Sequence, residues 1–272
     1  MKKVILITGA SSGMGKDCAL ALIKQGHIVY GAARRTALMQ DLLDAGGHAI
    51  ELDITQPASI NHAVNRIMSE QGRIDVLFNN AGYAVYGAVE DITIEEARNQ
   101  FEVNLFGLAA ITQAVVPLMR AQNKGLIINT SSMGGKMYTP LGAWYHASKH
   151  AVEGFSDCLR LELKQFNINV VILEPGIIVT EFGDVMLKNI SKFSAEGAYS
   201  TLTRKLVTAT KKMYENGQGS KTTIISKTVT KIVNSVKPKT RYRVRLWAKP
   251  MVWMRIYLGD KLFDKIVMSQ VK

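Results

Sequence analysis

Six short runs of apolar, β-favouring residues recur along the first 180 residues, and longer helical patterns separate them. The runs lie at about 3–9, 27–33, 48–54, 74–82, 125–132 and 168–176, and they are apolar throughout rather than alternating with polar residues. Strands have this composition when helices cover both faces of their sheet. Because strands separated by helices form βαβ units, we expect an α/β fold with a parallel sheet between two helical layers.

The stretches between these runs predict helices at about 15–25, 36–45, 58–71, 94–120 and 145–165. The chain has 272 residues, of which 47% are apolar, so one large domain with a sizeable core is expected. The regular pattern ends near residue 180. We therefore expect a single domain over 1–272, with a core over 1–185 and a less regular extension over about 186–272.

The positive charge of the chain is concentrated near its C-terminus. Residues 1–199 carry 17 Lys and Arg against 19 Asp and Glu, a net of −2. Residues 200–272 carry 17 against 3, a net of +14. An anionic partner is therefore expected to meet the C-terminal part of the chain.

The two cysteines, Cys18 and Cys158, lie far apart and give neither a metal-ligand spacing nor a disulfide framework. The five histidines show no ligand spacing either, so no metal is expected. The start, "MKKVILITGA", is too short for a signal peptide and runs into a glycine-rich turn. No stretch is expected to reach the roughly 20 apolar residues of a membrane span. A reducing, cytoplasmic compartment is the simplest expectation.

A glycine-rich turn, "TGASSGMG" at residues 8–15, follows the first apolar run and precedes the first predicted helix. Glycines let the backbone turn sharply and approach a phosphate, and the N-terminus of the next helix favours that phosphate. An ordinary turn between a strand and a helix is the alternative. The residues expected to bind the phosphates are Gly9, Ser11, Ser12, Gly13, Met14 and Gly15.

These glycines, spaced G-x-x-x-G-x-G, occur together with "NNAG" at 79–82 and a Tyr-x-x-x-Lys pair, Tyr145 and Lys149. In this combination the chain resembles the short-chain dehydrogenase/reductase family, from residue 4 to about 185. Its hydroxysteroid or retinol dehydrogenase-like and carbonyl reductase-like members are the nearest in pattern. The resemblance implies a Rossmann-type, doubly wound parallel sheet, with the C-terminal basic segment as a helical extension. It also implies hydride exchange with a nicotinamide dinucleotide.

The end of the second strand indicates which dinucleotide is used. An acidic residue there binds the ribose 2′-hydroxyl of NAD, whereas arginine accommodates the 2′-phosphate of NADP. Ala33 stands where family members that use NAD carry aspartate, and Arg34 and Arg35 follow it. The planar guanidinium groups suit a phosphate, so we expect NADP(H). The alternative is that both arginines are merely solvated.

The resemblance implies further cofactor contacts. Asp53 would accept a hydrogen bond from the adenine amino group and Ile54 would line the ring, although Asp53 could instead cap the next turn. Tyr145 and Lys149 would also touch the cofactor. Ile178 and Thr180 lie in "PGIIVT", which resembles the family's nicotinamide loop. The remaining implied contacts are Asn80, Ala81, Gly82, Pro175 and Gly176.

Tyr145 and Lys149 are four residues apart and so share one face of a helix. A neighbouring ammonium lowers the pKa of an acid, and free tyrosine titrates near pH ~10. Beside Lys149, and near a positively charged oxidised nicotinamide, Tyr145 is therefore predicted to exchange protons closer to neutral pH and to act as the acid in reduction and the base in oxidation. His146 and His150 flank this pair but are expected to face elsewhere on the helix.

Two further catalytic residues follow from the resemblance. Ser132 lies 13 residues before Tyr145, which is the family spacing, and would donate a hydrogen bond to the substrate oxygen. Asn104 would fix a water that relays protons through Lys149 and the ribose hydroxyls. Asparagine is a poor helix former in its predicted place, although an ordinary polar helix residue is the alternative.

The substrate side is rich in large apolar residues. They are Met133, Met137, Tyr138, Leu141, Trp144, Phe182 and Met186. We expect a lipophilic substrate such as a steroid, a retinoid or a long-chain acyl carbonyl. Simple core packing is the alternative.

Residues 237–272 mix basic side chains with Trp247, Trp253, Met251, Leu258 and Phe263. This composition suits a lid over the substrate, a subunit contact or a segment on an anionic membrane surface. Nucleic acid is not expected as a partner. By resemblance to the family, a homodimer or tetramer through the helices at 94–120 and 145–165 is expected.

Taken together, these patterns predict an NADP(H)-dependent enzyme that interconverts an alcohol and its ketone or aldehyde. The alternative from another class is a binding protein that senses NADP(H) without turnover. A sensor would tolerate the loss of Tyr145, Lys149 or Ser132, and all three are present.

Overall fold

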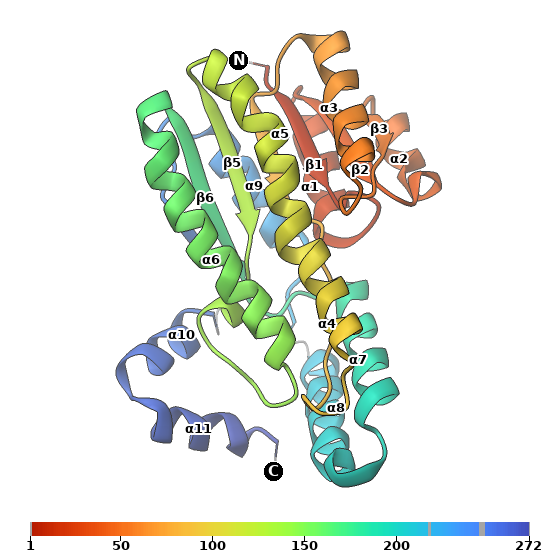
Figure 1. Ribbon diagram of the computed structural model, residues 1–272, viewed down its shortest axis with the longest axis vertical. Helices are drawn as coiled ribbons and strands as arrows, with labels where there is room; N and C mark the ends of the chain where they lie inside the picture. Colours follow the sequence, from red (N-terminus) through yellow and green to blue (C-terminus); the bar gives the residue numbers. More distant parts are fainter. Residues whose placement is uncertain (1, 217–218, 245–247, 272) are drawn as a thin grey trace.

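A computed structural model describes residues 2–216, 219–244 and 248–271, with one parallel sheet at their centre (Figure 1). The strands run in the order β3-β2-β1-β4-β5-β6-β7, and each pairs in parallel with its neighbours. Their bounds are β1 Val4–Thr8, β2 Ile28–Ala33, β3 His48–Glu51, β4 Val76–Asn79, β5 Gly125–Thr130, β6 Ile168–Pro175 and β7 Arg241–Val244. The order reverses between β1 and β4, as in a doubly wound Rossmann-type sheet.

Helices cover both faces of the sheet. One face is covered by α1 (Gly13–Lys24), α2 (Gln40–Asp44) and α9 (Thr223–Asn234), whose apolar side chains share one buried cluster with the strands. The other face is covered by α3 (Pro57–Gln71), α5 (Leu108–Ala121) and α6 (Ala143–Leu163), which contribute to a second cluster. The predicted three-layer architecture is confirmed, and the strands are buried because both of their faces meet helices.

The predicted helix at 94–120 is continuous but not uniform. It consists of α4 (Ile94–Phe101), a π-helical segment (Glu102–Gly107) and α5. Among the described residues, this stretch, Ile94–Ala121, is the one helix long and apolar enough to cross a membrane, with a mean hydropathy of 1.5 over its most apolar window. The expectation that no such stretch exists was therefore wrong on composition. Ile111, Val115 and Met119 are buried on the sheet, and 33% of the apolar window is buried in all.

The seventh strand was not predicted, because "RYRV" at 241–244 carries two arginines and lacks an apolar run. It lies at the edge of the sheet beside β6, with Arg241 opposite Ile172 and Arg243 opposite Glu174. A charged edge strand discourages pairing with other chains. The charge at the C-terminus is therefore partly structural, and Arg241 and Arg243 are not available to an anionic partner.

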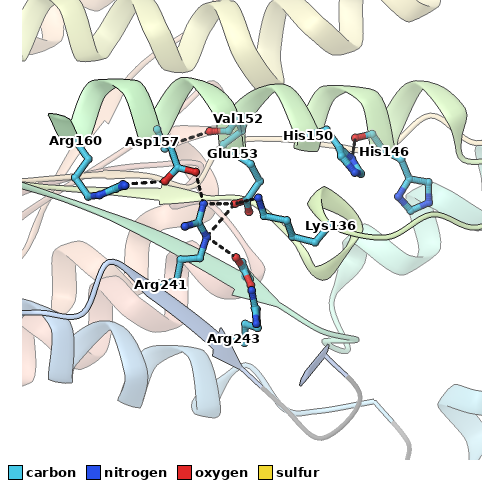
Figure 2. A network of polar contacts seen from close by, with 11 residues as sticks. Lys136, His146, His150, Val152, Glu153, Asp157, Arg160, Arg241 and Arg243 are labelled. Atoms are coloured by element: carbon cyan, nitrogen blue, oxygen red, sulfur yellow. Dashed lines mark hydrogen bonds and ion pairs between the residues drawn. The ribbon is translucent and has the colours of Figure 1, made fainter. Parts of the chain in front are cut away.

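The two arginines of β7 pair with three carboxylates, of which those of Glu153 and Glu174 are almost fully buried (Figure 2). Arg241 lies 2.9 Å from Glu153 and 2.6 Å from Asp157, both on α6, and 3.0 Å from Glu174 on β6. Arg243 pairs with the other oxygen of Glu174 at 2.6 Å. Glu174 is 0% exposed and Glu153 is 2% exposed, so these pairs compensate charges that water cannot reach. The network joins β7 to the helix that carries Tyr145 and Lys149.

The remaining helices lie beyond the carboxyl ends of the strands, at the end of the molecule opposite the N-terminus (Figure 1). They are α7 (Glu181–Ser194), α8 (Ser200–Glu215), α10 (Ala248–Tyr257) and α11 (Asp260–Ser269). The C-terminal extension is thus helical except for β7. Trp247, named in the sequence prediction, lies outside the described residues.

Candidate active site

A cleft of about 960 Å³ opens at the carboxyl ends of β1, β2 and β4, where the strand order reverses. Open α/β sheets bind ligands at this place because neighbouring loops diverge there. Its walls are formed by the loops that follow these strands and by the segment after β3, which contains Asp53. The π-helical segment and the start of α7 complete them. Its size lies at the upper end of the range for small-molecule sites and suits a ligand as long as a dinucleotide.

The glycine-rich turn forms the floor of this cleft. Gly9 and Gly13 have positive φ angles of 67° and 55°, which glycine adopts without strain. A Cβ on Gly9 would lie 2.8 Å from the Cα of Ala81, so the turn and the loop after β4 approach more closely than a side chain would allow. The helix α1 begins at Gly13, and no side chain caps its first turn. Its N–H groups are therefore free to bind an anion.

Gly15 has a different role from the one predicted. A Cβ on Gly15 would lie 2.3 Å from the carbonyl oxygen of Gly9 and 2.5 Å from Nδ2 of Asn80. Gly15 is buried and does not line the cleft, so it allows α1 to pack closely on the turn. Asn80 fixes the same turn, because its Nδ2 donates to the carbonyl oxygens of Thr8 and Gly9 at 3.2 Å each.

Arg34 and Arg35 follow β2 and line the opposite end of the cleft. Arg35 lies 3.5 Å from Glu181, the first residue of α7, and both side chains are more than half exposed. An ion pair this exposed contributes little stability. Both guanidinium groups are therefore accessible to a phosphate at the rim of the cleft, and no carboxylate replaces Ala33 at the end of β2.

Asp53 performs the role that the sequence left as its alternative. Its Oδ1 accepts hydrogen bonds from the backbone N–H of Thr55 at 3.0 Å and from the Thr55 hydroxyl at 2.7 Å. Burial opposes charge on this carboxyl, but the bonds from Thr55 and the nearby Arg34 lower its pKa overall. Asp53 also lines the cleft, so capping the turn leaves it positioned to contact a ligand.

Tyr145 lies on the first turns of α6 and is only 8% exposed. Its ring contacts those of Tyr86 and Phe182 at centroid distances of 5.7 and 5.6 Å. Burial raises its pKa to about 12, and a hydrogen bond with Ser132 offsets only part of this rise. In the chain without a bound cofactor the pKa of Tyr145 is therefore raised, because desolvation outweighs the effect of the neighbouring groups. The shift toward neutral pH beside an oxidised nicotinamide stays a prediction.

Lys149 is buried one turn beyond Tyr145 on the same helix. Its Nζ donates a hydrogen bond of 3.0 Å to the carbonyl oxygen of Thr130, the last residue of β5. Burial lowers its pKa to about 8, while the carboxylate of Glu153 acts in the opposite direction. A Cβ on Gly82 would lie 3.6 Å from this Nζ, which shows that the ammonium reaches the loop lining the cleft.

Ser132 lies just after β5, between the loop that follows it and Tyr145 on α6. Its hydroxyl oxygen accepts the backbone N–H of Gly134 at 3.0 Å, and the hydroxyl also hydrogen-bonds Tyr145. The neighbouring Ser131 hydroxyl is buried without a partner in the described residues, so the two serines are in different surroundings. The spacing that selected Ser132 is consistent with this geometry.

Asn104 lies in the π-helical segment and is 1% exposed. Its Oδ1 accepts the backbone N–H of Tyr83 at 3.0 Å, and its Nδ2 donates to the carbonyl of Tyr83 and to the hydroxyl of Ser148, each at 3.0 Å. Single π-helical turns within α-helices often occur at functional sites. Asn104 therefore binds the loop after Gly82 to the helix of Tyr145 and Lys149.

His146 holds the loop that follows Ser132. Its Nδ1 lies 2.9 Å from the carbonyl oxygen of Gly134, and its Nε2 accepts the backbone N–H of Thr139 at 3.0 Å. Burial lowers its pKa to about 4, so the ring is neutral at physiological pH. The expectation that it faces away from the catalytic pair is partly met: it contacts the loop, although its ring also lies 5.6 Å from that of Tyr145.

The predicted substrate residues separate into three groups. Leu141, Phe182 and Met186 pack in the cluster that contains Tyr145. Met133, Met137 and Tyr138 pack instead against Phe263 and Val267 of α11 and against α10. Trp144 belongs to a third cluster, between the loop after β4 and the end of α7. Of the three groups, only the first packs around Tyr145, where it could contact the apolar part of a substrate whose oxygen lies at the Tyr145 hydroxyl.

The cleft brings together thirteen of the predicted cofactor residues. They are Gly9, Ser11, Ser12, Gly13, Met14, Arg34, Arg35, Asp53, Ile54, Asn80, Ala81, Gly82 and Thr180. Gly15, Tyr145, Lys149, Pro175, Gly176 and Ile178 do not line it. Ile178 is buried in the core and forms an isolated β-bridge with Ser220. Sequence reasoning missed eleven further residues, which are mostly neighbours of predicted ones: Thr8, Ala32, Leu52, Thr55, Gln56, Tyr83, Asn99, Glu102, Val103, Glu181 and Val185.

The similarity of the chain to known proteins agrees with this geometry. The short chain dehydrogenase family matches residues 3–190, and the chain belongs to this family of oxidoreductases. A 3-ketodihydrosphingosine reductase from Bacteroides thetaiotaomicron is 45% identical over 194 residues, which cover 71% of this chain and 70% of that protein.

A short-chain dehydrogenase from Streptomyces avermitilis has a TM-score of 0.80 and 31% identity, covering 98% of this chain and 95% of that one. The closed form of a serine dehydrogenase complexed with NADP+ has a TM-score of 0.78 and 28% identity, covering 88% and 93%. The second of these structures holds NADP+, and the cleft described above has the size and the glycine turn for a dinucleotide.

Proposed function

We propose that this protein is an NADP(H)-dependent reductase or dehydrogenase that interconverts a lipophilic ketone or aldehyde and its alcohol. The observation that carries the proposal is that Ser132 and Tyr145 lie on either side of Gly134, with Lys149 one turn further along α6, beside a cleft floored by the glycine turn. A protein that only senses the cofactor would have no use for a hydroxyl pair poised at one point in an apolar pocket.

The residues of the cleft fit a dinucleotide with a 2′-phosphate. Gly9 and Gly13 let the backbone approach the pyrophosphate, and the free N–H groups at the start of α1 face it. Arg34 and Arg35 would hold the 2′-phosphate, because the fork of a guanidinium donates two hydrogen bonds to such a group. Glu181, now paired with Arg35, is the nearest competitor for that guanidinium.

The bound dinucleotide supplies or accepts a hydride at the substrate carbon. Ser132 hydrogen-bonds the substrate oxygen, and Tyr145 gives a proton to that oxygen in reduction or takes one in oxidation. Lys149 places a positive charge next to this exchange and would bind the nicotinamide ribose. Because burial holds Tyr145 protonated in the free chain, the acid form needed for reduction is present at neutral pH.

Asn104 keeps the loop after Gly82 and the helix α6 in register and, as we infer, also orders a water that carries protons to Lys149. The π-helical turn supports this role, because it interrupts the regular hydrogen bonding of the helix where Asn104 lies. Asn104 thus acts on the substrate through Lys149 and not directly.

The substrate that we propose is lipophilic. Leu141, Phe182 and Met186 surround Tyr145 with apolar surface, and further apolar residues of α7 and α8 join the same cluster. The Bacteroides relative is named as a reductase of 3-ketodihydrosphingosine, which supports a long-chain ketone. A steroid or retinoid carbonyl would suit the same surface.

We further propose a cytoplasmic homodimer or tetramer. Phe106 on the π-helical segment and Leu161 on α6 are 54% and 69% exposed, which leaves apolar contacts available on the two helices named for subunit association. The mass of the protein in solution, measured by light scattering, tests the proposed subunit number independently of activity.

The cofactor preference is tested by titrating the protein separately with NADPH and NADH and following protein fluorescence. We expect NADPH to bind at least tenfold more tightly, and the double variant Arg34→Ala/Arg35→Ala to lose that preference while still binding NADH. Arg98→Ala, an exposed arginine on α4 outside the cleft, is the matched control. Equal affinity for the two dinucleotides in the wild type would contradict the proposal.

A further inference from the structure

Helix α10 has an exposed face made of large apolar side chains. Lys249, Trp253, Ile256 and Tyr257 follow one another at spacings of four, three and one, which places them on one side of the helix. Trp253, Ile256 and Tyr257 are 55, 54 and 69% exposed, and the two rings lie 5.5 Å apart. Soluble proteins rarely leave an aromatic group of this size in water without a partner.

The orientation of this face is fixed by the opposite side of the helix pair. Val252 of α10 and Phe263 of α11 are fully buried, and Phe263 packs on the loop after Ser132, with its ring 5.2 Å from that of Tyr138. The Tyr138 hydroxyl donates a hydrogen bond of 2.8 Å to Asp264. The pair α10–α11 is therefore anchored directly to the loop of the active site, and its other side is left facing outward.

Helix α11 continues the exposed apolar character and adds positive charge. Leu262 and Met268 are 46 and 43% exposed, with Lys261 and Lys265 beside them on the surface. The two aspartates of this helix are both engaged, because Asp260 pairs with Arg255 and Asp264 accepts from Tyr138.

The lysines, in contrast, are free. Lys249, Lys261 and Lys265 have no ion pair or hydrogen bond within residues 2–216, 219–244 and 248–271. The exposed residues of α10 and α11 thus include aromatic and aliphatic side chains and three unpaired lysines, against one carboxylate, Asp264, whose partner is a neutral hydroxyl.

We propose that the exposed side of α10–α11 docks on the surface of an anionic lipid bilayer. Tryptophan and tyrosine are favoured at the level of the lipid headgroups, where their rings meet the acyl chains and their polar atoms stay wet. Lysine near an anionic leaflet contributes about 1 kcal/mol each. With ten residues each, the two helices lie in the interface and do not span the bilayer.

Docking in this way would place the loop after Ser132 next to the membrane, since Tyr138, Met133 and Met137 hold α10–α11. A lipophilic substrate would then pass between bilayer and active site without crossing water. This consequence rests on the proposed function, whereas the docking itself does not. A second copy of the chain on the same face is the competing occupant, and it is separated by the measurements below.

The test is co-sedimentation of the whole protein with phosphatidylcholine vesicles, with and without about one third phosphatidylglycerol, at low and high salt. We expect binding to the anionic vesicles at low salt, weaker binding at high salt, and little binding to phosphatidylcholine alone. Trp253→Ser/Tyr257→Ser should reduce the partition coefficient at least tenfold. Val236→Ser, at an 89% exposed apolar position before β7, is the control and should leave it unchanged.

The charge contribution is tested in the same assay. Lys261→Gln/Lys265→Gln should weaken anionic binding by about fivefold per lysine, whereas Lys227→Gln/Lys231→Gln, exposed on α9, should not. Absence of wild-type binding, or equal binding by all variants, would overturn the proposal. So would a fall from dimer to monomer in light scattering for Trp253→Ser/Tyr257→Ser, because the face would then be a subunit interface. NADPH titration of the same samples shows separately whether the cofactor site is intact.

Discussion

Arg241 on β7 and Glu153 on α6 lie 2.9 Å apart, and this contact joins the last strand of the sheet to the helix that carries the catalytic residues (Figure 2). Glu153 is almost fully buried, and Lys136 contributes a second positive charge at 3.3 Å. Burial lowers the pKa of Arg241, whereas the hydrogen bonds that it donates to Asp157 and Glu153 raise it, and the net effect is a raised pKa. The arginine is therefore charged at every accessible pH.

Removing Arg241 should destabilise the protein strongly. Arg241→Ala leaves Glu153 and Glu174 buried with only part of their countercharge, and breaking a buried ion pair from one side costs about 3–5 kcal/mol. We expect a loss of about 3 kcal/mol in the free energy of unfolding, measured by urea denaturation. Arg160→Ala is the control, since Arg160 pairs at 2.8 Å with the more exposed Asp157 and should cost less than about 1 kcal/mol. Equal losses of stability in the two variants would show that the buried ion pairs of Arg241 contribute no more than the exposed pair of Arg160.

The buried positive charge of Lys149 should lower the free energy of unfolding at neutral pH. Burial lowers its pKa from 10.5 to about 8, which corresponds to roughly 3 kcal/mol of unfavourable charging in the folded state. Between pH 8 and 10.5 the unfolded chain binds a proton at Lys149 that the folded chain has released, so wild-type stability rises with pH across this window. We therefore expect Lys149→Met to raise the free energy of unfolding by about 2 kcal/mol at pH 7.

That gain should shrink as the pH rises from 8 to 10.5, because the wild type then carries a neutral lysine in the fold. Urea denaturation of both proteins at several pH values gives the difference directly. Lys24→Met, at an exposed lysine on α1, provides the baseline for replacing a lysine by methionine. A gain that does not depend on pH would mean that better packing, and not the charge of Lys149, is responsible.

Gly9 and Gly46 separate two effects of adding a side chain at a positive φ angle. Both have positive φ, 67° and 85°, but a Cβ on Gly9 would lie 2.8 Å from Ala81, whereas nothing lies within 4 Å of one on Gly46. Gly46→Ala should cost about 1–2 kcal/mol of stability from backbone strain alone. Gly9→Ala should cost more and should also weaken NADPH binding at least tenfold, because Gly9 lines the cleft. Identical effects of the two changes on NADPH binding would contradict this role for the turn.

Most of the sheet was predictable from the sequence because six of its strands are runs of uniformly apolar residues. The six runs became β1 to β6, and the helices between them lie within about two residues of the predicted ranges. The seventh strand gave no such signal, since Arg241 and Arg243 compensate buried carboxylates that the sequence places far away, at Glu153 and Glu174. A pattern of local hydrophobicity cannot reveal a strand whose burial depends on distant charge.

The site was predictable where backbone geometry demands particular residues and less so where desolvation decides. The glycine turn and the arginines after β2 lie on one cleft as expected. Burial raises the pKa of Tyr145 in the chain without a bound nicotinamide, and the spacing of Tyr145 and Lys149 could not indicate this because spacing says nothing about how much water reaches two side chains. Asp53 shows a third case, in which capping of a turn and exposure to the cleft occur in the same side chain.

The measurement that tests the account most directly is the loss of NADPH absorbance with a panel of lipophilic ketones, 3-ketodihydrosphingosine among them, for the wild type and Tyr145→Phe. Phenylalanine keeps the ring contacts with Tyr86 and Phe182 and removes the hydroxyl that bonds Ser132. We expect turnover by the wild type and a fall of at least a hundredfold in kcat for the variant, with NADPH binding unchanged. Equal turnover by the two proteins would contradict the assignment of Tyr145 as the proton donor.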